Sequence, residues 1–315
     1  MPPWAGAPTF PSGDAGRPGG GSGRPSLAAG RRALSGTAIL ARAVAGGITC
    51  AYMSSTSGPV TSKPVALRDR AVTVATELGA RALHSTESWV LKHSLVPTTP
   101  FLSLDTFPWV GRMEEMVPVV QAELDEVLSH REELPNFQDI SIDQASISND
   151  DGWKTFFFLA YGFRSEANCR RCPKTAALLD SIPGLVTGFF SILSPGKHIP
   201  PHRGPWRGVV RYHLALKVPE PAEASGIKVG GEEAHWEEGK SLLFDDGYTH
   251  EAWNGTDGVR VVLFCDILRP LRPPAEQVNR ALMKAISWSP FIQDARNRHE
   301  AWEKRVENLR WGNGN

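Results

Sequence analysis

Residues 186–193 read VTGFFSIL, residues 209–218 read VVRYHLALKV, and residues 259–267 read VRVVLFCDI. A shorter run, SLLF, occupies residues 241–244. All four runs are rich in β-branched and aromatic residues and are separated by clusters of Pro, Gly, Asn and Asp, which predicts β-strands joined by turns. Several short strands in succession are typical of an antiparallel sandwich or barrel.

Helical patterns lie around this β-rich stretch. Apolar residues recur at spacings of three and four in each of them, and Pro173 suits the first turn of the short one. We expect helices over Val65–Leu95, Arg112–His130, Pro173–Ser181, Ala275–Trp288 and Phe291–Leu309. The last segment mixes Arg, Lys, Glu and Trp, which suits a lid or peripheral membrane contact, and we favour the lid.

The composition predicts a folded core and excludes several function classes. Of 315 residues, 41% are hydrophobic and ten are Trp, so the chain can bury enough surface to fold. Lys+Arg and Asp+Glu both number 34, and this zero net charge argues against a nucleic-acid partner. The most apolar stretch, Ala33–Met53, is interrupted by Arg42, so we expect no transmembrane segment.

Residues 1–62 differ from the rest of the chain. They are rich in Gly and Pro and hold five arginines but a single acid, Asp14. An acid-poor, Arg-containing leader predicts a mitochondrial or plastid transit peptide. The alternatives are a disordered extension or translation from Met53, so the expected location is cytoplasmic or organellar.

The cysteines do not predict a disulfide framework. Cys50, Cys169, Cys172 and Cys265 are too few for a disulfide-stapled scaffold in a chain of this length. Cys169 and Cys172 form a single CxxC without a second pair. We therefore expect reduced thiols or a redox-sensitive pair rather than a zinc site.

Two histidines lie beside predicted strand ends. His202 and His250 are 48 positions apart (250 − 202), and a barrel would bring such positions together at its mouth. Two neutral imidazoles could then hold a metal ion. The alternative is that each is an ordinary structural histidine.

Two arginines lie in apolar runs. Arg211 and His213 are two apart on one predicted strand, so their side chains share a face. Arg260 stands among Val259 and the apolar residues after it, where burial is unfavourable unless an anion pairs with the guanidinium. A small polycarboxylate fits this chemistry. The alternative is that both arginines point outward from edge strands.

The order of these motifs resembles the aspartyl/asparaginyl β-hydroxylase family, over about Asp151–Pro270. The resemblance rests on SILSPGKHIPPHRGP at 191–205, RYHL at 211–214, WEEGKSLLFDDGYTHEAW at 236–253, VRVVLF at 259–264 and the CPKT turn at 172–175. It implies a mainly β fold with helical support, namely the double-stranded β-helix, a jelly-roll, cupin-like barrel. The predicted organisation is a leader at 1–62, helical support at 63–150, the barrel at 151–270 and C-terminal helices at 271–315.

The resemblance also implies the site. His202 and His250 would be the catalytic metal ligands for Fe(II), and Arg260 would anchor 2-oxoglutarate together with Arg211, His213 and Ser191. Many iron(II) dioxygenases supply a carboxylate two residues after the first histidine, where this chain has Gly204. Asp245 and Asp246 are either a turn or groups that orient the metal ligands. Candidates for the dry barrel walls are Phe190, Leu214, Leu243, Phe244 and Val262, and the sequence leaves open which of them face inward.

The implied activity is that of an Fe(II)- and 2-oxoglutarate-dependent dioxygenase that uses O2. Its expected substrate is the β-carbon of Asp or Asn in a peptide or protein. One alternative is a lipid acyl chain, since some relatives that resemble this chain hydroxylate lipids. Another is a non-catalytic barrel that binds 2-oxoglutarate. The aromatic run at 156–158, together with Trp153 and Tyr161, is expected to be core rather than substrate contact.

Overall fold

The computed structural model describes residues 85–141, 147–204 and 206–307. The predicted leader, Cys50 and most of the helix expected over Val65–Leu95 lie outside the described residues, although residues 85–92 of that segment are helical. All helices and strands named in this section lie within these described residues, which include the predicted barrel.

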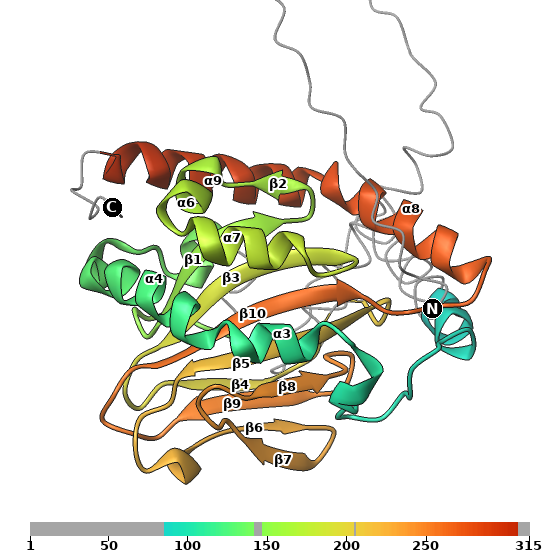
Figure 1. The fold of residues 1–315 in the computed structure, drawn as a ribbon. Helices are drawn as coiled ribbons and strands as arrows, with labels where there is room; N and C mark the ends of the chain where they lie inside the picture. The colour runs from blue at the N-terminus through green and yellow to red at the C-terminus, as the bar shows by residue number, and fades with distance from the viewer. Residues whose placement is uncertain (1–84, 142–146, 205, 308–315) are drawn as a thin grey trace, which may run out of the picture.

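Ten strands form two antiparallel sheets that face each other (Figure 1). The larger sheet has the order β2 (Phe163–Arg164), β1 (Trp153–Ala160), β3 (Leu185–Leu193), β10 (Arg260–Leu268), β5 (Val209–Lys217) and β8 (Ser241–Phe244). The smaller sheet has the order β4 (His198–His202), β9 (His250–Asn254), β6 (Ser225–Val229) and β7 (Glu232–His235).

The strand order is that of a double-stranded β-helix. From β3 to β10 the chain alternates between two four-stranded sets, β3-β10-β5-β8 and β4-β9-β6-β7, except at β6 and β7, which follow each other in the smaller sheet as a hairpin. Two such interleaved sheets are the jelly-roll arrangement of cupins, as the sequence predicts. The four predicted strand runs correspond to β3, β5, β8 and β10, which supply the centre and one edge of the larger sheet.

Helices cover the outer face of the larger sheet and the end of the molecule beside β1 and β2 (Figure 1). The helix expected over Arg112–His130 is in fact two helices. Pro118 is the second residue of the latter one and cannot donate the backbone hydrogen bond that a continuous helix requires. The described helices with printed bounds are α3 (Val110–Glu115), α4 (Val117–Ser129), α5 (Phe137–Ile140), α6 (Glu166–Arg171), α7 (Pro173–Asp180), α8 (Ala275–Ser287) and α9 (Pro290–Val306), with 3-10 turns at Leu104–Thr106, Arg131–Glu133 and Ala222–Ala224.

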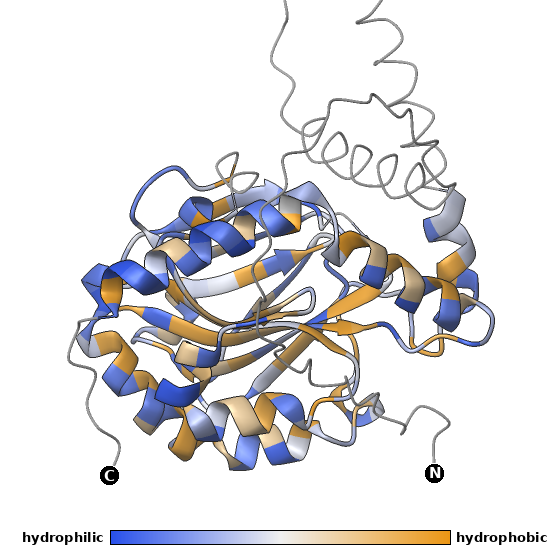
Figure 2. Ribbon diagram, turned by 90° about the horizontal axis from the view of Figure 1, so that it is seen from above, coloured by the Kyte–Doolittle hydropathy of each residue, from blue (hydrophilic) through white to orange (hydrophobic). Residues whose placement is uncertain are grey.

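Side chains alternate between two cores along each strand of the larger sheet. On β3, Phe189 and Leu193 face the barrel interior, whereas Phe190 and Ile192 pack under the helices. Seen from above, hydrophobic residues concentrate in the strands, and the helices around them carry many hydrophilic residues (Figure 2). The alternation decides which candidate wall residues line the barrel. Phe244 and Val262 face its interior, whereas Phe190, Leu214 and Leu243 belong to the outer core.

Among the described residues, no helix has both the length and the apolar character that are needed to cross a bilayer.

Candidate active site

The pairing of β4 with β9 brings the two predicted metal ligands together. His202 is the last residue of β4 and His250 the first of β9, and the antiparallel register sets them directly opposite each other. Their ring centroids are 4.2 Å apart. Residues that are far apart in the sequence thus form one imidazole pair at the end of the smaller sheet.

Both imidazoles are held in the same tautomer. Nδ1 of His202 lies 2.8 Å from the carbonyl oxygen of Pro200, and Nδ1 of His250 lies 2.9 Å from that of Tyr248. A carbonyl only accepts, so each Nδ1 carries the proton and donates it, which leaves the lone pair on Nε2. Burial lowers the pKa of His202 to about 4 and that of His250 well below its usual value. Both rings are therefore neutral at pH 7, which is the form that binds metal ions.

Asp246 places a carboxylate beside Gly204, the position two residues after His202. A Cβ at Gly204 would overlap the Asp246 carboxylate, so no larger residue fits there unless Asp246 moves. Asp246 is fully buried and lies 2.8 Å from Nη2 of Arg211. Burial raises the pKa of Asp246 to about 7, although the Arg211 charge acts in the opposite direction. In the described part of the chain, no group of three or more His, Cys, Asp or Glu side chains forms a complete metal site.

The neighbouring Asp245 has a structural role. Its Oδ1 accepts a hydrogen bond from the backbone N–H of Gly247 at 3.0 Å, as expected of a turn residue. Its Oδ2 lies 2.6 Å from Nη2 of Arg269 and also pairs with Arg207. The two aspartates thus divide the predicted roles: Asp245 fixes the turn, and Asp246 lies beside the histidine-bearing strand ends.

Arg260 is a cation buried in the barrel interior. Its side chain is 2% exposed, its guanidinium lies 4.4 Å from the ring centroid of Trp236, and Nε and Nη1 have no hydrogen-bond partner. Burial lowers its pKa to about 9, so it is still charged at pH 7. Within the described ranges no carboxylate forms an ion pair with it, and this leaves the guanidinium available to an anion.

Two further polar groups share the barrel interior with Arg260. Neither ring nitrogen of the buried His213 has a hydrogen-bond partner among the described residues, and its ring centroid lies 6.0 Å from that of Trp236. Ser191 Oγ accepts a hydrogen bond from Trp153 Nε1 at 3.0 Å. A cation and two hydrogen-bonding side chains thus lie together at one end of the barrel interior.

Arg211, the remaining predicted cosubstrate residue, has a different environment. It pairs with Asp266 at 2.9 Å as well as with Asp246, and it stacks 4.3 Å from the centroid of Phe264. Its pKa is raised by these two carboxylates despite its burial. The alternative that both arginines point outward from edge strands is wrong, because β5 and β10 are central strands and both guanidiniums lie on the inner face.

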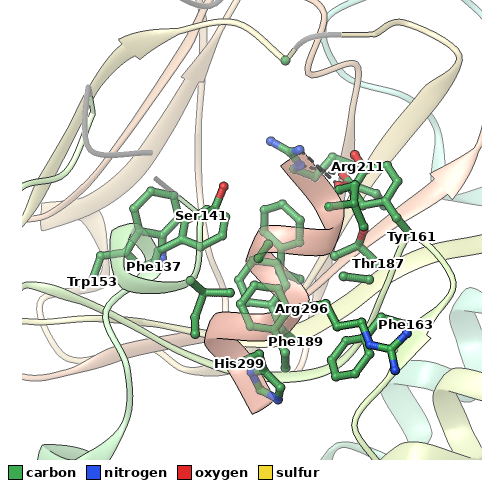
Figure 3. A pocket seen from close by; sticks show the side chains of 18 of the residues that line it. Phe137, Ser141, Trp153, Tyr161, Phe163, Thr187, Phe189, Arg211, Arg296 and His299 are labelled. Carbon is green, nitrogen blue, oxygen red and sulfur yellow. Dashed lines mark hydrogen bonds and ion pairs between the residues drawn. The ribbon is translucent and has the colours of Figure 1, made fainter. Parts of the chain in front are cut away.

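A largely apolar cavity of about 170 Å³ opens beside His202 (Figure 3). Strands β1, β3 and β10 form one wall, and the short helix α5 and the C-terminal helix α9 form another. Residues of β2, β4 and β5 and the two residues that follow β4 add to the lining. Trp153 and Phe157 are buried in the barrel core, as the sequence predicts, and they also contribute to the cavity wall. The other apolar and aromatic lining residues are Phe137, Ile140, Ala160, Tyr161, Phe163, Phe189, Phe264, Ile292 and Ala295.

The charged side chains that line this cavity are all paired. Arg211 binds Asp266, Arg203 lies 2.8 Å from Glu87, and Arg296 lies 2.7 Å from Glu300. The cavity therefore differs from the inner end of the barrel, where Arg260 has no counterion. The sequence analysis favoured a lid role for this C-terminal segment but did not predict which residues of α9 line the cavity, since the spacing of residues 292, 295, 296 and 299 is that of any amphipathic helix.

Three comparisons with known proteins bear on this site. The family model for aspartyl/asparaginyl beta-hydroxylase matches residues 114–270. The ornithine lipid ester-linked acyl 2-hydroxylase of Rhizobium tropici is 50% identical over 219 residues, which cover 70% of this chain and 78% of that protein. The chain belongs to the aspartyl/asparaginyl β-hydroxylase family. Human aspartate beta-hydroxylase domain-containing protein 2 is 34% identical over 58% of this chain and 50% of its own length.

The segment that matches the family model contains all six predicted site residues but ends before α8 and α9. Human aspartyl/asparaginyl beta-hydroxylase is 36% identical over 131 residues, which make up 40% of this chain and only 17% of that protein. In this β-hydroxylase family member, the histidine pair and Arg260 therefore come from the matched segment, and part of the cavity wall comes from the helix that follows it.

The CxxC motif lies away from the histidine pair. Cys169 and Cys172 are buried at α6 and at the start of α7, and neither they nor Cys265 forms a disulfide. Burial raises the pKa of Cys169 to about 11 and raises that of Cys172 still further. Both thiols are protonated at pH 7, so they are poor nucleophiles and poor metal ligands.

Proposed function

We propose that this chain is an Fe(II)- and 2-oxoglutarate-dependent hydroxylase that acts on the acyl chain of a lipid. The observation that carries the proposal is the combination of two imidazoles with Nε2 lone pairs and a buried arginine without a counterion. The buried arginine is unfavourable in the protein alone, and an anionic ligand would neutralise it. The paired Nε2 lone pairs have no role in the protein alone, and a metal ion would use them.

The residues present fit the proposed cofactor and cosubstrate. Neutral imidazoles suit ferrous iron, so His202 and His250 would hold it through Nε2. Arg260 would bind the distal carboxylate of 2-oxoglutarate, with His213 and Ser191 as hydrogen-bonding partners. When bound, the iron supplies oxygen activation, which couples conversion of 2-oxoglutarate to succinate and CO2 with hydroxylation of a C–H bond.

The remaining groups hold this arrangement. Asp246 presents a carboxylate in the space that a side chain at position 204 would occupy, and Arg211 fixes its orientation. Asp245, between Arg207 and Arg269, fixes the turn that precedes His250. The hydrophobic barrel wall at Phe244 and Val262 excludes water from the reacting centre.

The cavity favours an acyl chain over an aspartyl side chain. Its walls are mainly aromatic and aliphatic, and the charged groups that line it are already paired, so it offers no uncompensated cation to a substrate carboxylate. The relative that is 50% identical is named for hydroxylation of an ester-linked acyl chain. Peptidyl Asp or Asn hydroxylation remains the second candidate, supported by the name of the family and of the human relative.

The test is succinate release with Fe(II), 2-oxoglutarate and O2, in the presence of either a lipid with ester-linked acyl chains or an Asp/Asn-containing peptide. We expect lipid-dependent succinate and a product that carries one additional oxygen by mass spectrometry. His202→Ala and His250→Ala should each lower turnover by about 100-fold or more, because each removes one of two metal ligands.

His198→Ala is the matched control, since His198 lies on the same strand as His202 but is exposed and paired with Glu251. Turnover with the peptide alone would replace the acyl proposal by the peptidyl one. Binding of 2-oxoglutarate without turnover on either substrate would favour a non-catalytic barrel.

A further inference from the structure

One face of α9 lines the cavity. Ile292, Ala295, Arg296 and His299 all contribute to its lining, and their spacing of three, one and three residues places them on one side of the helix. Ile292 and His299 are buried, Ala295 is half-buried, and Arg296 is exposed at the rim. The helix therefore presents a wall to the cavity and a solvated face to the outside.

The helix is held firmly in this place. Trp302 is buried, and its Nε1 donates to the carbonyl oxygen of Glu133 at 2.7 Å. Glu303 pairs with His299 at 3.2 Å and accepts a hydrogen bond from Ser165, which precedes α6. Two contacts to separate parts of the chain thus fix the distance between α9 and the barrel.

A row of aromatic rings runs from the end of the cavity near Arg211 to His299 on α9. Phe264 lies beside Arg211, and its ring centroid is 4.3 Å from that of Phe189. The centroid of Phe189 is in turn 4.5 Å from that of Phe157, which is 6.1 Å from the ring centroid of His299. In Figure 3, Arg211 and His299 lie at opposite ends of the lining residues, with Phe189 between them. Helix α9 thus runs alongside this row, and its His299 meets the end of the row that lies far from Arg211.

We propose that α9 determines the length of acyl chain that the enzyme accepts, with Ala295 as the specificity-determining residue. The proposal rests on the proposed lipid substrate. An acyl chain whose reacting carbon lies near His202 extends along the row of rings beside α9. Ala295 lies between Ile292 and His299 on this helix, so methylenes that reach the His299 end of the row pass the space that Ala295 leaves open. Ala295 has the smallest side chain that α9 places in the cavity, so enlarging it shortens the space without touching the metal ligands.

The test uses the whole chain and two matched variants on the same helix. Ala295→Phe fills the cavity, whereas Ala301→Phe adds the same ring to the exposed side of α9. Saturated fatty acids from octanoate to stearate compete with a fluorescent fatty acid in a displacement assay, which requires neither iron nor turnover. Hydroxylation of lipids with the corresponding ester-linked chains is measured in parallel.

We expect Ala295→Phe to weaken binding of the longest chains by about 10-fold or more and to leave the shortest unchanged, while Ala301→Phe matches the wild type. Equal binding at all lengths by Ala295→Phe, or an equal loss at all lengths, would overturn the proposal, as would absence of fatty-acid binding by the wild type. If Ala295→Phe fails to fold, two smaller changes test the same dependence on chain length. Ala295→Leu should weaken binding of the longest chains, and the cavity-enlarging Ala295→Gly should not.

The two proposals fail in different ways. Length-dependent fatty-acid binding without lipid-dependent succinate would contradict the proposed function and support the role of α9 as a wall for apolar chains. Lipid-dependent succinate with the same chain-length profile in wild type and Ala295→Phe would support the function and contradict the role of α9.

Discussion

The two ends of the barrel are built from the same strands but differ in whether a buried arginine is neutralised by a carboxylate. The mouth is the end that holds Arg211, and the inner end is the one that holds Arg260. β5 carries Arg211 and His213 two residues apart, and β10 carries Arg260 and Asp266. At the mouth, Asp266 is the cross-strand partner of Arg211, and the two side chains form an ion pair. At the inner end, Arg260 stands opposite Leu193 and has no counterion among the described residues.

This difference separates a structural charge from a ligand-binding one. A buried ion pair can be accommodated by the fold alone, whereas a buried unpaired guanidinium destabilises the protein until an anion binds. Strained or unsatisfied groups of this kind mark functional sites. The contrast between Arg211 and Arg260 therefore predicts opposite effects on stability for the same substitution.

The largest effect is expected at Arg211. Arg211→Met would leave Asp266 and Asp246 buried without their cation, and we expect a loss of about 3–5 kcal/mol in the free energy of unfolding. Urea denaturation of the metal-free protein measures the change. Adding Asp266→Asn should restore part of the loss, because it removes one of the two uncompensated carboxylates. A loss below about 1 kcal/mol would show that the pair is not structural.

The same substitution at Arg260 should act on the ligand and not on the fold. Arg260→Met removes an unpaired buried charge, so the unfolding free energy without ligand should stay equal or rise by about 1–2 kcal/mol. The affinity for 2-oxoglutarate should fall by about 10- to 100-fold, since a charge-assisted hydrogen bond is worth about 1.5–3 kcal/mol. Anaerobic calorimetry with Fe(II) and 2-oxoglutarate measures it.

An Arg260→Met protein that is destabilised as much as Arg211→Met would remove the distinction between the two ends. An unchanged affinity for 2-oxoglutarate would assign the anion site to another residue.

Four strands of the larger sheet were predictable from sequence because they are buried on both faces. The other two, β1 and β2, were not predicted as strands, since the aromatic run of β1 was interpreted only as core. β3, β5, β8 and β10 lie between the barrel interior and the outer core, so their residues form nearly continuous hydrophobic runs. The smaller sheet was not predictable. β4 reads HIPPH, with two prolines, and β7 reads EEAH, so neither shows strand propensity. Pairing with neighbouring strands, not local sequence, makes these segments extended.

The candidate site divides in the same way. His202, His250 and Arg260 stood out because their residue types are unusual beside or within apolar strands and match a known motif. The occupation by Asp246 of the space above Gly204 was not predictable, since it depends on how the turn at Asp245 approaches a different strand. The C-terminal helix was expected to act as a lid, but its cavity-lining residues on α9 were not predictable, because an amphipathic pattern does not determine which surface the helix covers.

The smallest expected effect is on the pH dependence of the free energy of unfolding, and it tests whether His202 is desolvated as Arg260 is. Burial holds the pKa of His202 at about 4 in the folded, metal-free protein, against about 6.5 in an unfolded chain. Below pH 6.5 the unfolded chain takes up a proton that the folded protein does not, so this contribution to stability is complete above pH 6.5 and is lost as the pH falls towards 4. By about pH 5 we expect a loss of about 1–2 kcal/mol, and His202→Gln should lack it. Urea denaturation of EDTA-treated wild type and variant at neutral pH and near pH 5 measures the difference. An equal loss in both proteins would mean that His202 is solvated, and the histidine pair would then lack the desolvation that distinguishes Arg260.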